Sequence, residues 1–445
     1  MSELENTQRE QKRLASVATL HADEAREKMD WRKHLRRTSN GRELLGDVHN
    51  IRLAFEHAPE LAGLLRYNEL ARRVELMNAP PWRSLSSGAS WRDDDDIDLV
   101  SWLQAWNIPA RSDATLSRIV HAEANRNCVH PVRDWLNGLQ WDGEPRIAEV
   151  LIEVLCAAGE GLYLAAVLRR FMIGGVARIM RPGCKADHML VLVGAQGGGK
   201  STFARLLGAP WTVESHSTFG SKDAAQELDG AWIVEVAELS GMRKSEVETV
   251  KNFITKQSDH YRPAYGRHVI DQPRSCVFIG TTNEDKFLVD YTGNRRFWPI
   301  RCEGRFNFKL LEDSREQLWA EARCAFEAGE QWHLTAEEVR LAANVQEAHR
   351  VVGEVEQAVA SILKRRVKDA GTVPPAVSVL ELFREICGVE RDTENLSARR
   401  QMETAIGQAV KRAGWVHVGR RGEYRSTTYQ YVPPEPAANL SNPYG

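Results

Sequence analysis

Three short apolar runs, each ending in polar or glycine residues, mark the middle of the chain. They cover residues 189–193, 231–239 and 275–283. Such runs are typical of strands that are buried on both faces of a parallel sheet. Before and after this region, apolar residues recur at helical spacing instead. The pattern therefore predicts a multidomain protein whose centre is an α/β domain with a parallel sheet.

Changes in the pattern divide the chain into six segments. Two tryptophans among glycine and proline at residues 130–146 also predict a turn-rich connector within the second segment. We expect a charged tail or frayed helix at 1–40, a helical N-terminal region and candidate oligomerisation collar at 41–180, the α/β core at 181–305, its helical extension at 306–355, a separate module at 356–433 and a disordered tail at 434–445.

A run of four aspartates at residues 93–96 stands immediately before an apolar helical pattern. Carboxylates at a helix start interact favourably with the positive end of the helix dipole, which predicts a capping role. A metal site is the alternative interpretation, although acidic runs are usually solvated faces.

The first apolar run leads into the sequence GAQGGGKST, which fits the G-x-x-x-x-G-K-[ST] pattern of a phosphate-binding P-loop. Glycines let backbone N–H groups point at phosphate oxygens, Lys200 supplies a positive charge, and Ser201 supplies a hydroxyl for Mg²⁺. A helix expected over residues 201–207 would aim its N-terminus at the same anion. The predicted nucleotide-binding residues are Gly194, Ala195, Gln196, Gly197, Gly198, Gly199, Lys200, Ser201 and Thr202.

The second and third apolar runs end in side chains suited to hydrolysis. Glu235 and Glu238 lie three residues apart and cannot share a face of a regular strand. Glu238 is the first choice for the water-activating or Mg²⁺-binding carboxylate, because ligands lie at the carboxyl ends of parallel strands. Glu235 is the second choice for this role. The alternative is that Glu235 only neutralises an arginine in the core. Asn283 is expected to act as a sensor of water or γ-phosphate, unless it only forms a turn.

Two adjacent arginines follow in the sequence TGNRRFWP. Arg296 is the first choice for an arginine finger that stabilises charge on a transferring phosphoryl group, and Arg295 is the alternative or a salt-bridge partner. A finger acting on a neighbouring subunit requires a head-to-tail interface, which closes into a ring. Surface ion pairs are the simpler interpretation of the same two residues.

Two further segments combine basic side chains with turns. Residues 251–269 interleave basic and aromatic residues around a glycine, which predicts either a hairpin that grips a single DNA strand or an ordinary solvated hairpin. Residues 377–432 read as helix, helix and a basic hairpin, which predicts a winged-helix-like module that contacts DNA or another protein. The candidate DNA-binding residues are Lys251, Arg262, Tyr265, Arg267, His268, Arg420, Arg421 and Arg425.

Composition restricts how these segments can act. The formal net charge is −2, so any nucleic acid must be bound through a local basic surface. The seven cysteines are scattered without a C-x-x-C pair, which predicts reduced thiols rather than disulfides or zinc ligands. The chain shows no signal-peptide pattern and no apolar stretch long enough to span a bilayer. We therefore expect a cytoplasmic protein that has no membrane partner.

The motifs GAQGGGKST, WIVEVAEL, SDHYRPAYGR, FIGTTN and TGNRRFWP together resemble the virulence-associated protein E family. Members of this family are similar to superfamily-3 helicases, which are AAA+-type ATPases of phages, plasmids and viruses. The upstream sequence HPVRDWLNGLQWDGEPR also resembles the lead-in of the same family. The resemblance covers about residues 120–305 strongly and the N-terminal helical region weakly.

The resemblance implies a ring-forming motor of a prophage or mobile element that depends on ATP and Mg²⁺ and is expected to be a hexamer. It also implies that Arg262, Tyr265 and Arg267 lie on a hairpin that contacts single-stranded DNA in a central channel. Two features depart from the pattern. The acids that superfamily-3 members often place side by side are separated here, and no primase-like domain is evident upstream, so a separate primase or initiation protein is expected to supply priming.

The leading functional hypothesis is an ATP-dependent DNA helicase or translocase of phage or mobile-element replication, which hydrolyses ATP at the subunit interfaces of a ring. The alternative is a DNA-bound ATPase switch in replication interference, regulation or defence, without unwinding. A DNA-binding scaffold with a decayed P-loop is disfavoured, because Lys200, Ser201, Glu238, Asn283 and Arg296 are all intact. A small-molecule kinase would have no use for the basic hairpin or the C-terminal module.

Overall fold

The computed structural model describes residues 31–84, 89–215, 219, 221–239, 244–262, 269–288, 293–370, 376–388, 396–421 and 426–431. Two compact units divide the chain. The first contains residues 1–287 and 291–349, and the second contains residues 288–290 and 350–445. Together they form a multidomain α/β protein.

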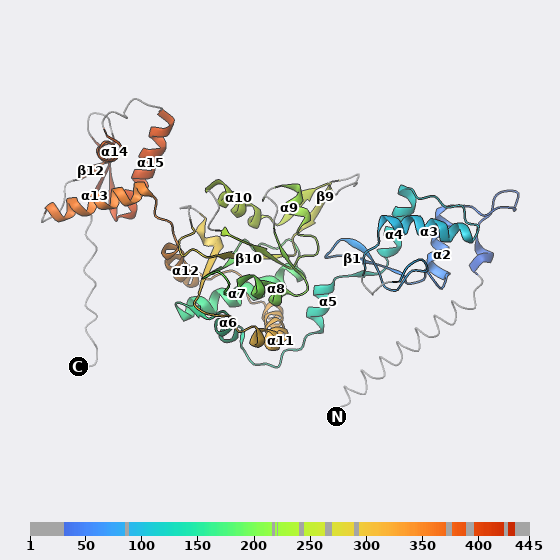
Figure 1. The fold of residues 1–445 in the computed structure, drawn as a ribbon. Coiled ribbons are helices and arrows are strands. Elements are labelled where there is room, and N and C mark those ends of the chain that lie inside the picture. Colours follow the sequence, from blue (N-terminus) through green and yellow to red (C-terminus); the bar gives the residue numbers. More distant parts are fainter. Residues whose placement is uncertain are drawn as a thin grey trace. The chain divides into compact units, whose positions relative to one another are not determined.

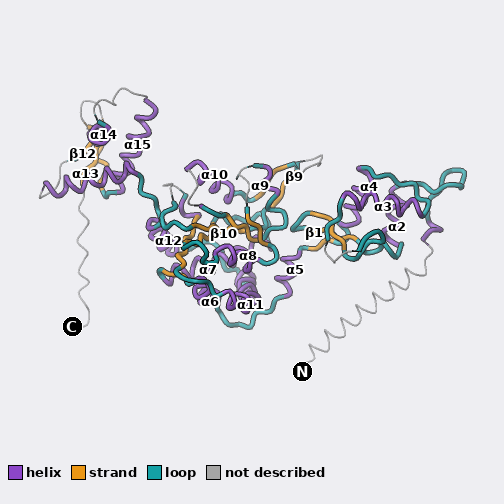
Figure 2. The backbone as a smooth tube through the Cα atoms, in the orientation of Figure 1, coloured by secondary structure: helices purple, strands orange, loops and turns teal. Residues whose placement is uncertain are grey.

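The N-terminal part of the first unit contains strands as well as helices, which corrects the prediction of a helical region (Figure 2). Asn68 explains the difference, because its side chain accepts hydrogen bonds from the backbone N–H groups of Leu70 and Ala71 and so closes a turn between two four-residue strands. Strands this short give little periodic signal. The elements are η1 (Trp31–His34), α2 (Val48–His57), β1 (Leu65–Asn68), β2 (Arg73–Leu76), α3 (Asp93–Ala105), α4 (Ala114–Ala124) and β3 (Cys128–Val129), with the sheet order β2–β1–β3.

The aspartate run caps a helix, as the first of its two interpretations predicted. Helix α3 begins at Asp93, and the Asp95 carboxylate accepts a hydrogen bond from the backbone N–H of Arg92 at 2.8 Å. Asp95 is buried and also accepts from the Trp82 indole and the Arg83 guanidinium. Among the described residues, no cluster of three or more His, Cys, Asp and Glu side chains could hold a metal ion.

The central sheet of the first unit has the order β4–β11–β5–β10–β7–β6 within the described residues. Five of these strands run parallel, whereas the two-residue strand β4 pairs antiparallel with β11. The sheet is therefore mixed and not purely parallel as predicted. The sequence contains no sign of β4, because a strand of two residues leaves no pattern. The three apolar runs form β5, β10 and β7, as predicted. The strands are β4 (Ala157–Ala158), β5 (Met189–Val193), β6 (Thr212–Glu214), β7 (Ile233–Val236), β10 (Val277–Thr282) and β11 (Phe297–Cys302).

Helices cover both faces of this sheet (Figure 1). On one face α7 (Gly161–Met180) and α8 (Lys200–Gly208) pack against the central strands, with α6 (Ile147–Leu155) and α11 (Phe308–Glu327) packed on α7. On the other face lies α10 (Lys244–Thr255), whose Phe253 ring contacts Phe278 of β10. The remaining elements of this unit are α5 (Pro131–Gly138), α9 (Lys222–Gln226), β8 (Ser258–Tyr261), β9 (Ile270–Pro273), η3 (Asn294–Arg296) and α12 (Ala336–Ala348).

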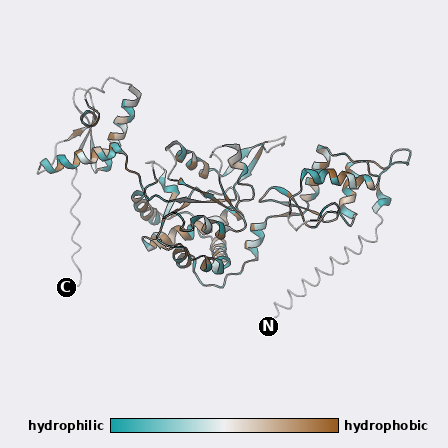
Figure 3. Ribbon diagram, viewed as in Figure 1, coloured by the Kyte–Doolittle hydropathy of each residue, from teal (hydrophilic) through white to brown (hydrophobic). Residues whose placement is uncertain are grey.

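Hydrophobic residues of the central strands and of the helices packed on them belong to one buried cluster. Figure 3 shows the hydropathy of each residue along the ribbon. Part of the predicted connector also joins this core, because residues 131–138 form α5 and bury Val132 and Leu136. Pro131 occupies the first helical turn, where proline is favourable, and the His130 ring accepts a hydrogen bond from the Arg133 N–H. The interpretation of 130–146 as turns is therefore wrong for its first half.

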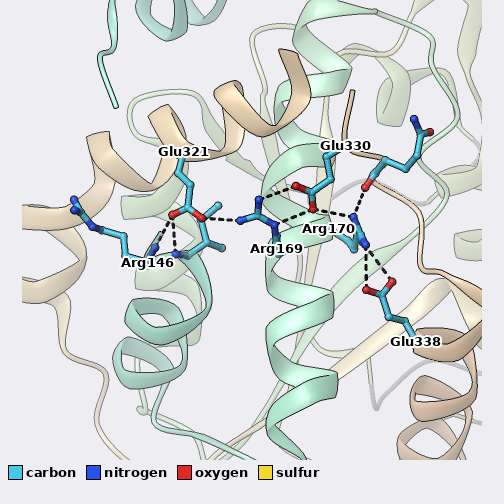
Figure 4. A network of polar contacts seen from close by, with 8 residues as sticks. Arg146, Arg169, Arg170, Glu321, Glu330 and Glu338 are labelled. Carbon is cyan, nitrogen blue, oxygen red and sulfur yellow. Dashed lines mark hydrogen bonds and ion pairs between the residues drawn. The ribbon is translucent and has the colours of Figure 1, made fainter. Parts of the chain in front are cut away.

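A partly buried network of charges connects α6, α7, α11 and α12 (Figure 4). Glu321 of α11 is 2% exposed and accepts hydrogen bonds from Arg169 Nη1 at 2.6 Å and from the backbone N–H groups of Arg146 and Ile147. Those two amides begin α6, whose N-cap residue Arg146 provides no side-chain hydrogen bond. Glu321 therefore caps α6 from a distant helix and places a negative charge at its positive end. Arg169 is held from the other side by Glu330, at 2.7 Å.

Replacing Glu321 with alanine is expected to lower the free energy of unfolding by about 3 kcal/mol, the low end of the range for breaking a buried ion pair. Arg169 would lose its buried partner and two helix-start amides would lose their acceptor. Glu327→Ala on the same helix is the matched control, because Glu327 is 51% exposed and its pairing with Arg323 is of the kind that contributes under about 1 kcal/mol. Denaturant unfolding measures both, and equal losses for the two variants would contradict the capping role.

Within its described residues, the second unit combines three helices with a small sheet of order β12–β14–β13. Helix α15 was predicted, as were the two strands after it, and Gly414 ends the helix with a φ of +83°. The unit buries its own apolar cluster, which includes Val359, Leu382 and Trp415. Its elements are α13 (Glu354–Ala370), β12 (Val377–Ser378), α14 (Val379–Cys387), α15 (Leu396–Arg412), β13 (Trp415–Arg421) and β14 (Ser426–Tyr431).

All seven cysteines are free thiols. Across the described part of the chain, every helix is too short or too polar to cross a membrane.

Candidate functional site

The glycine-rich segment forms a tight loop between β5 and α8. Gly197 and Gly199 have φ angles of +79° and +102°, in the left-handed region where side chains are disfavoured. A Cβ on Gly199 would also lie 2.4 Å from the Phe308 ring, so no larger residue fits there. Helix α8 begins immediately afterwards, at Lys200, close to the predicted start. The loop thus brings backbone N–H groups and a helix N-terminus to one point, an arrangement that suits an anion.

Lys200 lies at the centre of this loop and is 8% exposed. Its ammonium donates to the carbonyl oxygens of Gly194 and Ala195, at 2.7 and 2.8 Å, and to Asn283 Oδ1 at 2.9 Å. Burial lowers the pKa of Lys200, and the nearby Glu235 carboxylate opposes that shift. Asn283 directly follows β10, whose last residue pairs with the last residue of β5. The structure therefore brings together Lys200 and Asn283, which were predicted from motifs 83 residues apart.

Glu235 lies on β7 beside the loop and is buried. Burial raises the pKa of its carboxyl group, whereas hydrogen bonds from the hydroxyls of Ser201 and Thr281 and the charge of Lys200 act in the opposite direction. The Thr281 Oγ1 lies 3.3 Å from Glu235 Oε1. A carboxylate beside the P-loop serine stands where a cation shared with phosphate oxygens would be held.

Glu238 lies two residues beyond the end of β7. Its side chain is exposed and its φ is +56°, a left-handed conformation that costs of order 1 kcal/mol or more in a residue with a side chain. The structure thus brings Glu235, and not Glu238, to Ser201, which reverses the order in which the sequence ranked the two acids as Mg²⁺ ligands. The reason is that the strand ends at Val236, so Glu238 is no longer part of the sheet edge.

An open hollow of about 540 Å³ lies against the loop. Residues 194–198 and Lys200 form one wall, and residues 302–306 form the other. Sequence reasoning missed this second wall, which includes the exposed side chain of Arg305. Its position depends on β11 lying next to β5, and strand order cannot be read from an apolar pattern. The volume lies within the range of small-molecule sites.

The two arginines lie at the opposite edge of the sheet from the loop. Helix η3 ends at Arg296, directly before β11, and β11 starts beside Met189, the first residue of β5. Five residues of strand, or about 16 Å, therefore separate the arginine segment from the loop of the same chain. Arg296 is half-buried and donates from Nε to Thr255 Oγ1 at 2.9 Å, whereas Arg295 is exposed. Arg295 is thus better placed than Arg296, the first choice from sequence, to reach another subunit.

The predicted DNA-binding residues are only partly within the described chain. Arg262 is exposed just after β8, and β8 and β9 pair antiparallel as a hairpin requires. Lys251 is 2% exposed within α10, so we withdraw it from the DNA-contacting set, since its helical position buries it. Arg420 and Arg421 lie on β13, but their side chains are outside the described part. Tyr265, Arg267, His268 and Arg425 lie outside the described residues altogether.

Residues 136–351 match the family model described as the virulence-associated protein E-like domain. No curated protein matches the chain. Solved structures that the chain matches include the apo structure of the NrS-1 C-terminal region, residues 305–718, at 12% identity and a TM-score of 0.45 over 83% of this chain and 96% of that one. The A form of the same region gives 11% identity and a TM-score of 0.42 over the same shares.

Proposed function

Since residues 136–351 form a virulence-associated protein E-like domain, we propose that this chain is an ATP-hydrolysing DNA translocase or helicase that serves the replication of a phage or mobile element. One observation carries the proposal. Lys200, Ser201, Glu235 and Asn283 come from three separate motifs and meet at the carboxyl edge of adjacent parallel strands. That edge is where ligands bind in open α/β sheets.

The residues present fit an ATP site. Lys200 now bonds to two carbonyl oxygens of its own loop, and phosphate oxygens of ATP would replace those acceptors. The loop amides and the start of α8 would hold the remaining phosphate oxygens. The hollow beside them leaves room for the ribose and base, with Arg305 on its far wall.

Mg²⁺ would be held by the Ser201 hydroxyl and the Glu235 carboxylate, which are near each other at the loop. Mg²⁺ usually takes few protein ligands in such sites and completes its shell with phosphate and water, so a larger cluster of acids is unnecessary. Bound there, the ion supplies neutralisation of phosphate charge. Asn283 and Glu238 are assigned to the attacking water: Asn283 orients it, and Glu238, exposed beyond β7, accepts its proton.

Arg295 is assigned to the neighbouring subunit's site. Because the arginine segment lies at the opposite sheet edge from its own loop, a head-to-tail arrangement is what would bring it to a loop. A head-to-tail contact closes into a ring, which we propose to be a hexamer with single-stranded DNA in its channel, contacted by Arg262, Tyr265, Arg267 and His268.

A DNA-bound ATPase switch is the second candidate, and the separate C-terminal unit favours it. That unit has its own apolar cluster and a helix and hairpin of the kind found in winged-helix modules. Arg420, Arg421 and Arg425 would then contact duplex DNA. Such a protein needs no separate primase, whereas the replicative function does.

Hydrolysis, strand separation and mass measured on the full chain test both candidates. We expect ATP hydrolysis to be stimulated by single-stranded DNA, a forked duplex to be unwound, and nucleotide to shift the mass to that of a ring. Hydrolysis with duplex binding but without unwinding would favour the switch. A chain that neither hydrolyses ATP nor assembles would contradict both.

A further inference from the structure

The segment at residues 31–42 is the most basic short stretch of the described N-terminal part. It carries Arg32, Lys33, Arg36, Arg37 and Arg42 and contains no Asp or Glu. The whole chain has 59 Lys and Arg against 61 Asp and Glu, so without these five cations the remaining 54 face 61 acids, a net charge of −7. Residues 31–42 therefore carry a local positive charge, whereas the rest of the chain has a net negative charge.

The backbone of residues 31–42 is anchored to the core of the N-terminal part. Trp31 and Leu35 are buried in the core of the N-terminal part. Asn50 of α2 is fully buried, and its side chain accepts a hydrogen bond from the Arg36 N–H at 2.7 Å and donates to the Arg36 carbonyl at 2.8 Å. The turn that follows is closed by the Thr38 N–H, which donates to the Glu43 carbonyl at 2.8 Å. The basic side chains thus project from a fixed backbone, which lowers the entropy lost when they bind a ligand.

The five cationic side chains are all exposed. Among the described residues, the carboxylates near Arg36, Arg37 and Arg42 include Asp47, 3.7 Å from Arg36, and Glu43 at the end of the turn, whereas Lys33 already has a partner of its own. Both members of the Arg36–Asp47 pair are substantially exposed, and a pair of this kind is worth little in water. The surface therefore keeps a net positive charge and can attract an anion from a distance of a Debye length.

The chemistry of this surface favours phosphate over nucleic-acid bases. Guanidinium groups match phosphate oxygens with two parallel hydrogen bonds. The Arg32 guanidinium of this segment covers one face of the Trp106 ring, at 4.0 Å from the ring centroid. Contacts between guanidinium groups and phosphate position the nucleic acid without reading its sequence, so recognition here would depend on the backbone of the nucleic acid.

We propose that residues 32–42 form a second DNA-binding surface, separate from the channel hairpin, that holds the sugar–phosphate backbone without reading bases. The inference rests on the proposed function in that DNA is the macromolecule on which the protein acts. Its expected role is to keep DNA associated with the protein while the ATP-dependent part moves.

The test is the salt dependence of DNA binding by the full chain with Arg36, Arg37 and Arg42 all changed to Gln. Each lost phosphate contact lowers the slope of log affinity against log salt by about 0.9 for duplex and about 0.7 for a single strand. Loss of three contacts is therefore expected to lower the magnitude of the slope by about 2.7 with a duplex probe, or by about 2.1 with a single-stranded probe. The probe whose slope changes by the expected amount identifies the form of DNA that this surface binds. ATP hydrolysis without DNA should be unchanged.

A control variant removes the same charge elsewhere. Lys185, Lys309 and Arg340 are exposed on the central part of the first unit, and their change to Gln should leave the slope as in the wild type. An equal loss in this control, or an unchanged slope in the Arg36/Arg37/Arg42 variant while Arg262→Gln lowers it, would overturn the second surface and leave the proposed function intact. Wild-type protein that binds no DNA would overturn both.

Discussion

A Lys200→Ala variant should lose ATP hydrolysis by at least about 10²- to 10³-fold, the effect of removing one preorganised donor from a phosphoryl or acyl transition state. The ammonium contacts two loop carbonyls and Asn283, so it is already positioned at the point where the loop, β5 and β10 converge. Alanine leaves the loop amides in place but removes the positive charge that faces the β- and γ-phosphates. In the proposed motor, translocation depends on ATP hydrolysis, so strand separation should be lost together with hydrolysis.

The variant should still fold, since the glycine conformations and the strands around the loop do not depend on the lysine. Matched thermal unfolding curves of wild type and variant check this. Lys309→Ala is a suitable control, because Lys309 is exposed on α11 and pairs with Asp313 one turn away. DNA unwinding that survives in Lys200→Ala, with hydrolysis reduced to background, would contradict an ATP-driven motor.

The strands and the loop were predictable because their signals are local. The run at 189–193, the glycines after it and the helix that begins at Lys200 follow one another directly in sequence. Each therefore leaves a pattern that is read without knowledge of the rest of the chain. The same holds for α15 and the two strands after it, whose helix stop at Gly414 is a local backbone requirement.

The features that the sequence did not predict depend on tertiary contacts. The rank of Glu235 over Glu238 depends on where β7 ends, and strand ends are set by pairing with β10 and β6. The wall at residues 302–306 depends on strand order, and Glu321 caps α6 from 174 residues away. Lys251 appeared to belong to a basic surface because composition does not indicate which side of a helix is buried.

Arg295→Ala is expected to lower the turnover of ATP by about 10³-fold or more, with the KM for ATP little changed, if it completes a neighbour's site as an arginine finger does. Arg296→Ala should have a smaller effect, because Arg296 is committed to Thr255 within its own chain. Steady-state kinetics of the two variants separate the assignments. A larger loss in Arg296→Ala would return the finger to that residue, the first choice from sequence.

Mixing subunits gives a sharper form of the same prediction, because Lys200 and Arg295 lie at opposite edges of one sheet. In a head-to-tail ring assembled from equal amounts of Lys200→Ala and Arg295→Ala subunits, about a quarter of the interfaces would pair an intact lysine with an intact arginine. Hydrolysis should therefore reappear in the mixture although each variant alone is inactive. If mass measurement shows mixed rings and hydrolysis stays absent, the site is completed within one chain and the arginine acts in another way.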